Sequence, residues 1–237
     1  MNQPIDTRSS ERKLFAAVAI LFPLAVLIGF APTYYLKFAF ADTPLSLLVH
    51  AHGLFMTAWI ALFVTQVFLI SSKRVKTHQR LGILGITLAP LLVVLGVMTG
   101  IASAARGGGV PGIPPLSFLI VPIGDVIVFA ILFASAIYYR RKPANHKRLM
   151  LLTVLNFLPP ALGRFPFEWA STPPFFYGVP DLLAIVLVIL DTLHNRRLNK
   201  VFLAGALLMI ASHPLRITLA GTDTWLRIAA WLTSFAT

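Results

Sequence analysis

The sequence predicts an all-α polytopic integral membrane protein: a seven-helix transmembrane bundle with its N-terminus in the cytoplasm. Two features of the composition favour this fold class, because 57% of the 237 residues are hydrophobic and only 12% are charged. Soluble domains carry about 25% charged residues, so a single soluble core does not fit this chain. The third observation is that apolar runs of about 20 residues, long enough to cross a bilayer, recur along the whole sequence.

Seven apolar segments follow a polar N-terminal tail that ends near Lys13. We expect the spans at residues 14–31, 45–71, 81–103, 116–139, 149–163, 179–193 and 201–217. The fifth is short and contains Pro159 and Pro160, which predict a kink or an early end. The C-terminal tail, residues 222–237, has the aromatic and basic residues of an interfacial helix. With so little sequence outside these segments, we expect residues 1–237 to form a single transmembrane domain.

Lysine and arginine gather in alternate loops, and this pattern predicts the orientation. Of the 20 basic residues, 15 lie in the N-terminal tail or around the loops before the third, fifth and seventh spans. The other side holds Lys37, Arg106, Arg164, Arg216 and Arg227. The positive-inside rule therefore places the N-terminus in the cytoplasm and the C-terminus outside. The formal charge of +12 follows from this bias, so the expected partner is the lipid bilayer and not nucleic acid. The oligomeric state stays open.

The chain contains no cysteine, which excludes disulfides, Cys-ligated zinc, iron–sulfur clusters and c-type haem attachment. Walker, HExxH, GxSxG and Rossmann motifs, which would indicate a soluble type of enzyme, are missing as well. One local repeat is present: Thr77-His78-Gln79-Arg80-Leu81 resembles Asn145-His146-Lys147-Arg148-Leu149, and each opens an odd-numbered span. The repeat predicts that spans two–three and four–five are related hairpins.

A longer pattern carries a resemblance to known proteins. It consists of His52-Gly53, Trp59, Gln66, His78-x-Arg80-Leu81-Gly82, Asp125, His146-Lys147-Arg148-Leu149-Met150 and Arg164. This pattern resembles a widespread group of bacterial seven-span membrane proteins that has no established activity. The resemblance covers nearly the whole chain and implies this fold, this topology and the bacterial cytoplasmic (inner) membrane. A weaker similarity is to the b-type transmembrane cytochromes, although here the fourth span contains no histidine.

Ionisable residues inside spans cost about 2.5–3.5 kcal/mol each on insertion scales, so they indicate either function or a buried partner. The predicted topology places seven of them in the outer half of the membrane: His50, His52, Asp125, Arg164, Asp181, His213 and Arg216. His52 falls on one helical stripe with Trp59 and Gln66, which makes it a better ligand candidate than His50. His78 and His146 belong to the basic loops at the opposite side.

Three classes of function fit these residues. The first is a haem- or metal-binding redox protein, with haem b or a transition metal held by His52 and His213, and an inner pair formed by His78 and His146. The second is a zinc-dependent intramembrane hydrolase, loosely similar to the ceramidase and adiponectin-receptor superfamily. Its metal ligands would come from His50, His52, Asp125, Asp181 and His213, but the multiple-histidine motif of that superfamily's seventh span is missing.

The third class is a transporter or a non-catalytic membrane assembly factor, with Asp125, Asp181 and Arg164 as a polar relay. Each residue also has a purely structural interpretation. Asp125 pairs with Arg164 or Arg216 in a buried ion pair that holds the helices in register. His50 is interfacial, and His78 and His146 cap helices or contact lipid headgroups. The redox class is the first choice of the sequence, but the sequence alone does not separate it from the other two.

Overall fold

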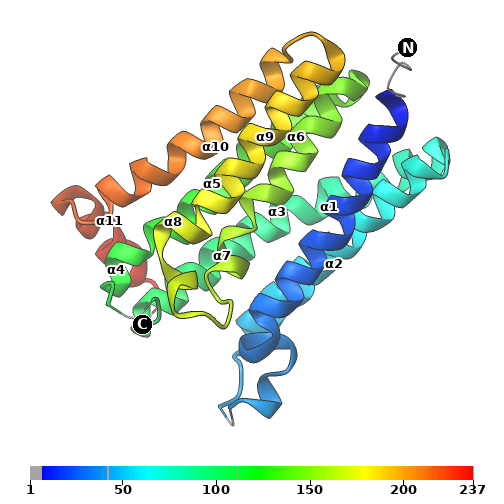
Figure 1. Cartoon of the computed structure of the whole chain (residues 1–237). Coiled ribbons are helices and arrows are strands. Elements are labelled where there is room, and N and C mark those ends of the chain that lie inside the picture. The colour runs from blue at the N-terminus through cyan, green and yellow to red at the C-terminus, as the bar shows by residue number, and fades with distance from the viewer. Residues whose placement is uncertain (1–6, 42, 111, 237) are drawn as a thin grey trace.

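The computed structural model describes residues 7–41, 43–110 and 112–236, and these ranges contain helices and no strand. The long helices run side by side in one bundle (Figure 1). They are α1 (Thr7–Phe30), α2 (Leu47–Ser71), α3 (Val75–Ala105), α5 (Ile120–Tyr138), α6 (Pro143–Asn156), α9 (Gly178–Asn195) and α10 (Lys200–Leu219). The shorter ones are α4 (Pro115–Phe118), α7 (Pro159–Leu162), α8 (Pro173–Phe176) and α11 (Asp223–Thr233). A π-helical turn (Ala31–Tyr35) extends α1, and short 3₁₀ turns occupy Lys37–Ala39, Tyr139–Arg141 and Glu168–Ser171.

Six helical segments of the described chain are long and apolar enough to cross a membrane. They are Leu14–Tyr35, Leu47–Ser71, Val75–Ala105, Pro115–Arg141, Pro173–Asn195 and Lys200–Leu219. The chain is therefore an all-helical, multi-pass membrane protein, as its composition predicts. One boundary differs in a way that matters below: α3 begins at Val75, so His78 lies in the first turn of a helix and not in a loop. His146 is placed in the same way in α6.

The predicted fifth span, residues 149–163, is not among the six segments. The structure divides it between α6 and α7, and neither helix has the length of a membrane span. Pro159 and Pro160 begin α7 and cannot donate to the preceding turn, which ends α6 at Asn156. Arg148 and Asn156 also make α6 more polar than its neighbours, so the count of seven membrane spans is not reproduced.

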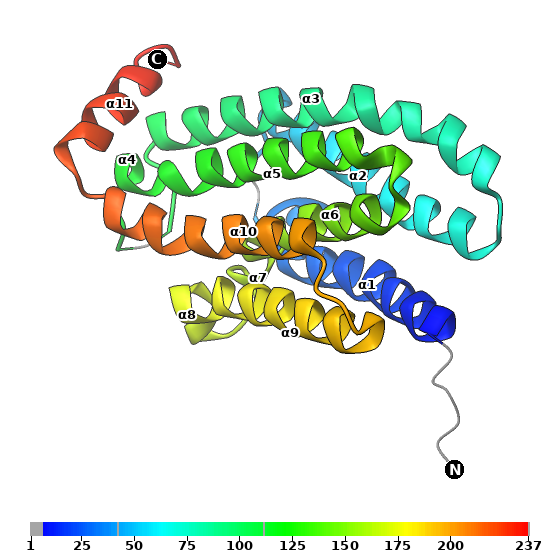
Figure 2. The same cartoon turned by 90° about the horizontal axis from the view of Figure 1, so that it is seen from above.

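Helix α6 lies in the middle of the bundle, with α5, α9, α10 and α1 around it (Figure 2). Arg148, Leu149 and every residue from Leu151 to Asn156 are buried. The helix contributes Leu149, Leu151, Leu152 and Leu155 to a core shared with α5, α9 and α10. On its other side, Val154 packs against α1, α2 and α7. Because α6 faces protein on most of its surface, it does not need the apolar surface that contact with lipid demands.

The connections sort to the two ends of the bundle. The start of α1 and residues 72–74, 139–142 and 196–199 lie at the upper end of Figure 1, which we call the basic end. The connection from α1 to α2, the segment 163–177 and α11 lie at the opposite end, which we call the aromatic end. Phe165, Phe167, Trp169 and Phe175 pack against one another there. The basic residues thus gather at one end of the bundle in three dimensions as well as in the sequence pattern.

Candidate functional site

A buried ion pair joins α5 to α10 near the aromatic end. Arg216 donates from Nη1 to the carboxylate of Asp125, and the two side chains are only 4% and 6% exposed. Arg216 also donates from Nη2 to Ser212 Oγ at 3.0 Å. The backbone carbonyl of Asp125 accepts a hydrogen bond from Asn156 Nδ2 of α6 at 2.9 Å. Of the two arginines that the sequence offers to Asp125, the structure places Arg216 beside it.

The ion pair depends on a glycine next to the carboxylate. A Cβ atom added at Gly124 would lie 2.3 Å from Arg216 Nε and 2.7 Å from Arg216 Cδ, which is far inside van der Waals contact. The arginine side chain therefore lies directly against the backbone of α5 and reaches Asp125 from there. A Cβ at this position would push the guanidinium away from its partner.

A second acidic and basic pair lies beside the first. Nδ1 of His213 is 2.9 Å from Oδ1 of Asp181, although the two groups are not aligned as donor and acceptor. The His213 ring is 2% exposed and stacks on Tyr177, with 4.1 Å between ring centroids and 16° between planes. His213 and Arg216 share one face of α10, as their spacing predicts, and His213 interacts electrostatically with Asp125. We refer to Asp125, Tyr177, Asp181, His213 and Arg216 as the α5–α10 cluster.

Several buried polar atoms in and beside this cluster make no hydrogen bond within the described residues. They are both ring nitrogens of His213, Oδ1 of Asp181, the hydroxyl of Tyr177 and Oδ1 of the adjacent Asn156. Buried polar groups normally have partners, and leaving one without a partner costs about 1–3 kcal/mol. The α5–α10 cluster therefore holds unused hydrogen-bonding capacity inside the bundle.

The other candidate residues of the predicted outer set lie elsewhere. The His52 ring packs on α3, where its Cε1 is 4.0 Å from a Cβ built at Gly96. Among the described residues, no ring contact joins His52 to His213. Arg164 is exposed, donates to Pro160 O at 2.6 Å and lies 4.6 Å from the centre of the Phe30 ring.

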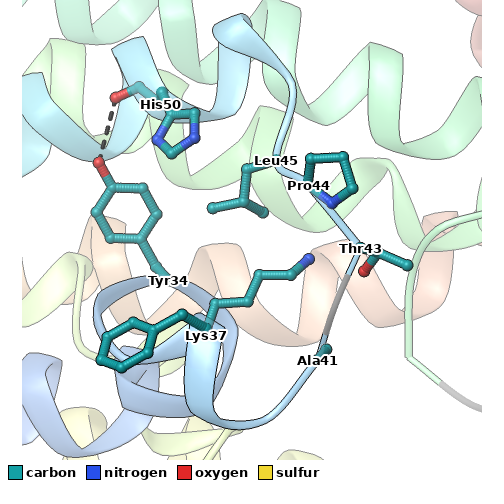
Figure 3. Close-up of a pocket in the computed structure, with 8 residues that line it drawn as sticks. Tyr34, Lys37, Ala41, Thr43, Pro44, Leu45 and His50 are labelled. Atoms are coloured by element: carbon teal, nitrogen blue, oxygen red, sulfur yellow. Dashed lines mark hydrogen bonds between the residues drawn. The ribbon is translucent and has the colours of Figure 1, made fainter.

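His50 is separate from all of these. It is exposed and lines a shallow pocket that also contains Tyr34, Lys37, Pro44 and Leu45 (Figure 3). Tyr34 donates its hydroxyl hydrogen to the backbone carbonyl of His50 at 3.3 Å. The close-up shows the imidazole of His50 pointing into this pocket, away from the bundle core. The predicted zinc ligands are thus divided among three places.

The opposite end of the bundle has a polar group of its own, which we call the α6–α9 cluster: Arg148, Asp191 and Asn195. Arg148 donates to the Asp191 carboxylate and to the carbonyl of Ala144, and Asn195 Nδ2 donates to Asp191 at 3.1 Å. The sequence reasoning missed this ion pair, because both residues are near the predicted ends of spans, where charge is common. The one available signal was Asp191, a carboxylate that directly follows the apolar run at residues 182–190.

His78 and His146 meet at the same end, with 6.5 Å between their ring centroids. The predicted inner pair of histidines is therefore adjacent, whereas the predicted outer pair, His52 and His213, is not in ring contact. In the part of the chain that the structure describes, no group of three or more His, Asp or Glu residues is placed to hold a metal ion.

No protein-family model, no curated protein and no solved structure matches this chain. Its function is therefore inferred from the geometry of these residues.

Proposed function

We propose that the protein is a proton-translocating membrane transporter and that the α5–α10 cluster is its proton-binding site. The observation that carries the proposal is a charge imbalance in a buried site. Asp125 and Asp181 are two carboxylates, and Arg216 is the one permanent cation beside them in the described structure. With His213 neutral the cluster has one net negative charge, and a proton on His213 balances it.

The charge imbalance matters because the cluster is buried. An unbalanced charge inside a protein is expensive, and buried ionisable groups in membrane spans commonly form proton relays. His213 is the group suited to take up a proton, because neither of its ring nitrogens makes a hydrogen bond to another described residue and its Nδ1 lies 2.9 Å from the Asp181 carboxylate. The groups that face it are Asp181 from α9, Tyr177 at the start of α9 and Asp125 from α5, with Arg216 on its own helix.

The exposure of the two residues supplies an entry path for the proton from the aromatic end to His213. Asp181 has a side chain that is 20% exposed near the aromatic end, while His213 behind it is 2% exposed. A proton can therefore enter at the carboxylate of Asp181 and move 2.9 Å to Nδ1 of His213. Asp125 and Arg216 hold each other in place and supply the fixed charges around the imidazole.

The number of membrane crossings and the orientation of the chain are part of the same proposal. We take α6 and α7 together as a seventh crossing that is surrounded by the other helices. The basic end is then cytoplasmic by the positive-inside rule, which places the N-terminus inside and the α5–α10 cluster in the outer half of a bacterial inner membrane.

The proposal is tested by proton flux in liposomes. The purified full-length protein is reconstituted with an internal pH dye, and a potassium diffusion potential drives protons inward. The expected result is dye acidification above the rate of empty liposomes, with at least a tenfold loss in His213→Gln and in Asp181→Asn. His50→Gln is the matched control, because His50 is exposed and lies outside the cluster.

The variants are compared only after gel filtration and thermal unfolding show folded, monodisperse protein. Flux equal to that of empty liposomes would reject proton translocation. Flux that persists in both cluster variants would reject this site as the proton carrier.

A further inference from the structure

The paired histidines at the basic end lie outside the proposed proton site and form a site of their own. His78 is the fourth residue of α3, and His146 is the fourth residue of α6. They occupy equivalent positions in the repeated sequence Thr77–Leu81 and Asn145–Leu149. The repeat thus places the same side chain at the start of two helices that belong to different hairpins, α2–α3 and α5–α6, and the fold brings the two imidazoles together.

The spacing of the rings matches coordination of one metal ion by both. Their centroids are 6.5 Å apart, and their planes make an angle of 78°. Metal–nitrogen bonds to histidine are about 2.0–2.1 Å long, so imidazoles on opposite sides of one ion have centres roughly 6 Å apart once each ring's half-width is added. A direct hydrogen bond between the rings would bring their centres closer than this, whereas an edge-to-face contact spans about 4.5–7 Å, so the free nitrogen atoms decide between contact and coordination.

The hydrogen bonds around the rings also leave ligand atoms free. Nδ1 of His146 lies 2.8 Å from the carbonyl oxygen of Ala136, which sets the proton on Nδ1 and leaves Nε2 with its lone pair. Histidines that bind metals are commonly oriented in this way by a backbone carbonyl. Nδ1 of His78 is buried and makes no hydrogen bond within the described protein, and the same is true of Oε1 of Gln66 in the neighbouring helix α2.

The number and charge of the available ligands decide which ion the two imidazoles can bind. Arg148 follows His146 by two residues, and its carboxylate partner, Asp191, is already engaged by Arg148 and Asn195. The two imidazoles are neutral ligands, and no third His, Asp or Glu among the described residues is placed to complete a metal site with them. A monovalent ion that accepts two nearly opposite nitrogen ligands is favoured over zinc, which demands four ligands in a tetrahedron.

We propose that His78 and His146 bind one copper(I) ion at the basic end of the bundle. The site is independent of the proton-binding cluster, and either proposal stands if the other fails. In this proposal each copy of the repeat supplies one ligand, which gives the repeated histidine a function beyond packing.

The experiment uses full-length protein in mild detergent, stripped of metal with a chelator and kept under anaerobic, reducing conditions. Copper(I) is titrated in competition with the chromophoric chelator bicinchoninate. The expected stoichiometry is one copper per chain, lost in His78→Ala and in His146→Ala and retained in His50→Ala. X-ray absorption should show two nitrogen ligands. His78→Gln and His146→Gln, which keep hydrogen-bonding side chains, guard against loss of binding through misfolding.

Three outcomes would overturn the proposal. The first is a wild-type protein that takes no copper from the chelator. The second is copper binding that survives in the folded His78 and His146 variants. The third is a different occupant: stoichiometric zinc in place of copper, or a dithionite-reduced haem spectrum in the purified protein that disappears in His78→Ala.

Discussion

The two buried arginine–aspartate pairs of this bundle resemble each other in geometry and differ in charge balance. Arg216 with Asp125 and Arg148 with Asp191 each connect two helices, and all four side chains are at most 13% exposed. Around the Arg148–Asp191 pair, Arg148 also donates to Ala144 O and Asn195 also donates to Asp191. Around Asp125 and Arg216, a second carboxylate lies close by, together with a histidine whose ring nitrogens make no hydrogen bond within the described residues. The balanced pair has the properties of a structural link, and the unbalanced one has those of a site.

The largest effect should come from breaking the unbalanced pair. Arg216→Ala leaves Asp125 buried without its cation, so we expect the free energy of unfolding to fall by about 3–5 kcal/mol. Arg148→Ala should cost less, about 1–3 kcal/mol, because Asp191 is 13% exposed and keeps Asn195 as a partner. Thermal unfolding in detergent, followed by gel filtration, measures both. Equal losses would show that the two pairs are not different in the way we describe.

A double variant sharpens this test. Replacing Asp125 by Leu and Arg216 by Met removes both charges together, and replacing a buried ion pair by apolar residues is often neutral for stability. We therefore expect the double variant to recover most of the stability lost in Arg216→Ala. If it is as unstable as the single variant, the loss comes from packing rather than from the isolated charge.

An intermediate effect is expected at the glycine that lets Arg216 reach its partner. Gly124→Ala places a Cβ 2.3 Å from Arg216 Nε, which must displace the guanidinium. We expect a loss of about 1–3 kcal/mol, the usual cost of overpacking. Gly221→Ala is the control, since a Cβ there has no atom within 4 Å and should change stability by less than about 0.5 kcal/mol. A Gly124→Ala protein as stable as the control would contradict the close approach.

The smallest effect on stability should come from Asp181→Asn. This change removes the second carboxylate and brings the cluster to neutrality without a proton on His213, so the free energy of unfolding at neutral pH should change by less than about 1 kcal/mol. The same variant is expected to lose proton flux. Measuring the unfolding of Asp181→Asn beside that of Arg216→Ala separates a role in proton binding from a role in stability. A large destabilisation of Asp181→Asn would show that Asp181 belongs to the structural ion pair.

The sequence predicted those features that depend only on residues close together in the chain. The length and hydropathy of apolar runs determine which segments become long helices, and i,i+3 spacing put His213 and Arg216 on one face of α10. The cost of a buried carboxylate was enough to predict that Asp125 needs a cation. The choice between Arg164 and Arg216 was not local, because it depends on how α10 and α5 are placed relative to each other.

The same limit explains what the sequence reasoning missed. Tyr177 stacks on His213 because segment 163–177 folds back towards α10, and no periodicity encodes that path. The central position of α6 was also hidden, since hydropathy measures suitability for lipid, whereas most of this helix faces protein. The haem and zinc hypotheses for the outer residues required His52 near His213 or near the two carboxylates, and those distances are set by helix packing.

The central position of α6 also has a consequence for biosynthesis. Helix α6 is a poor substrate for insertion on its own, since its 14 residues are too few to cross a bilayer and its first half carries Lys147 and Arg148. The carboxylate that neutralises Arg148 is synthesised 43 residues later, on α9. We therefore expect α6 to lie beside α5, without its contacts to α9 and α10, until those two helices have been synthesised. We also expect the bundle to close around α6 late in assembly, and a chain truncated before Asp191 to be degraded in the membrane.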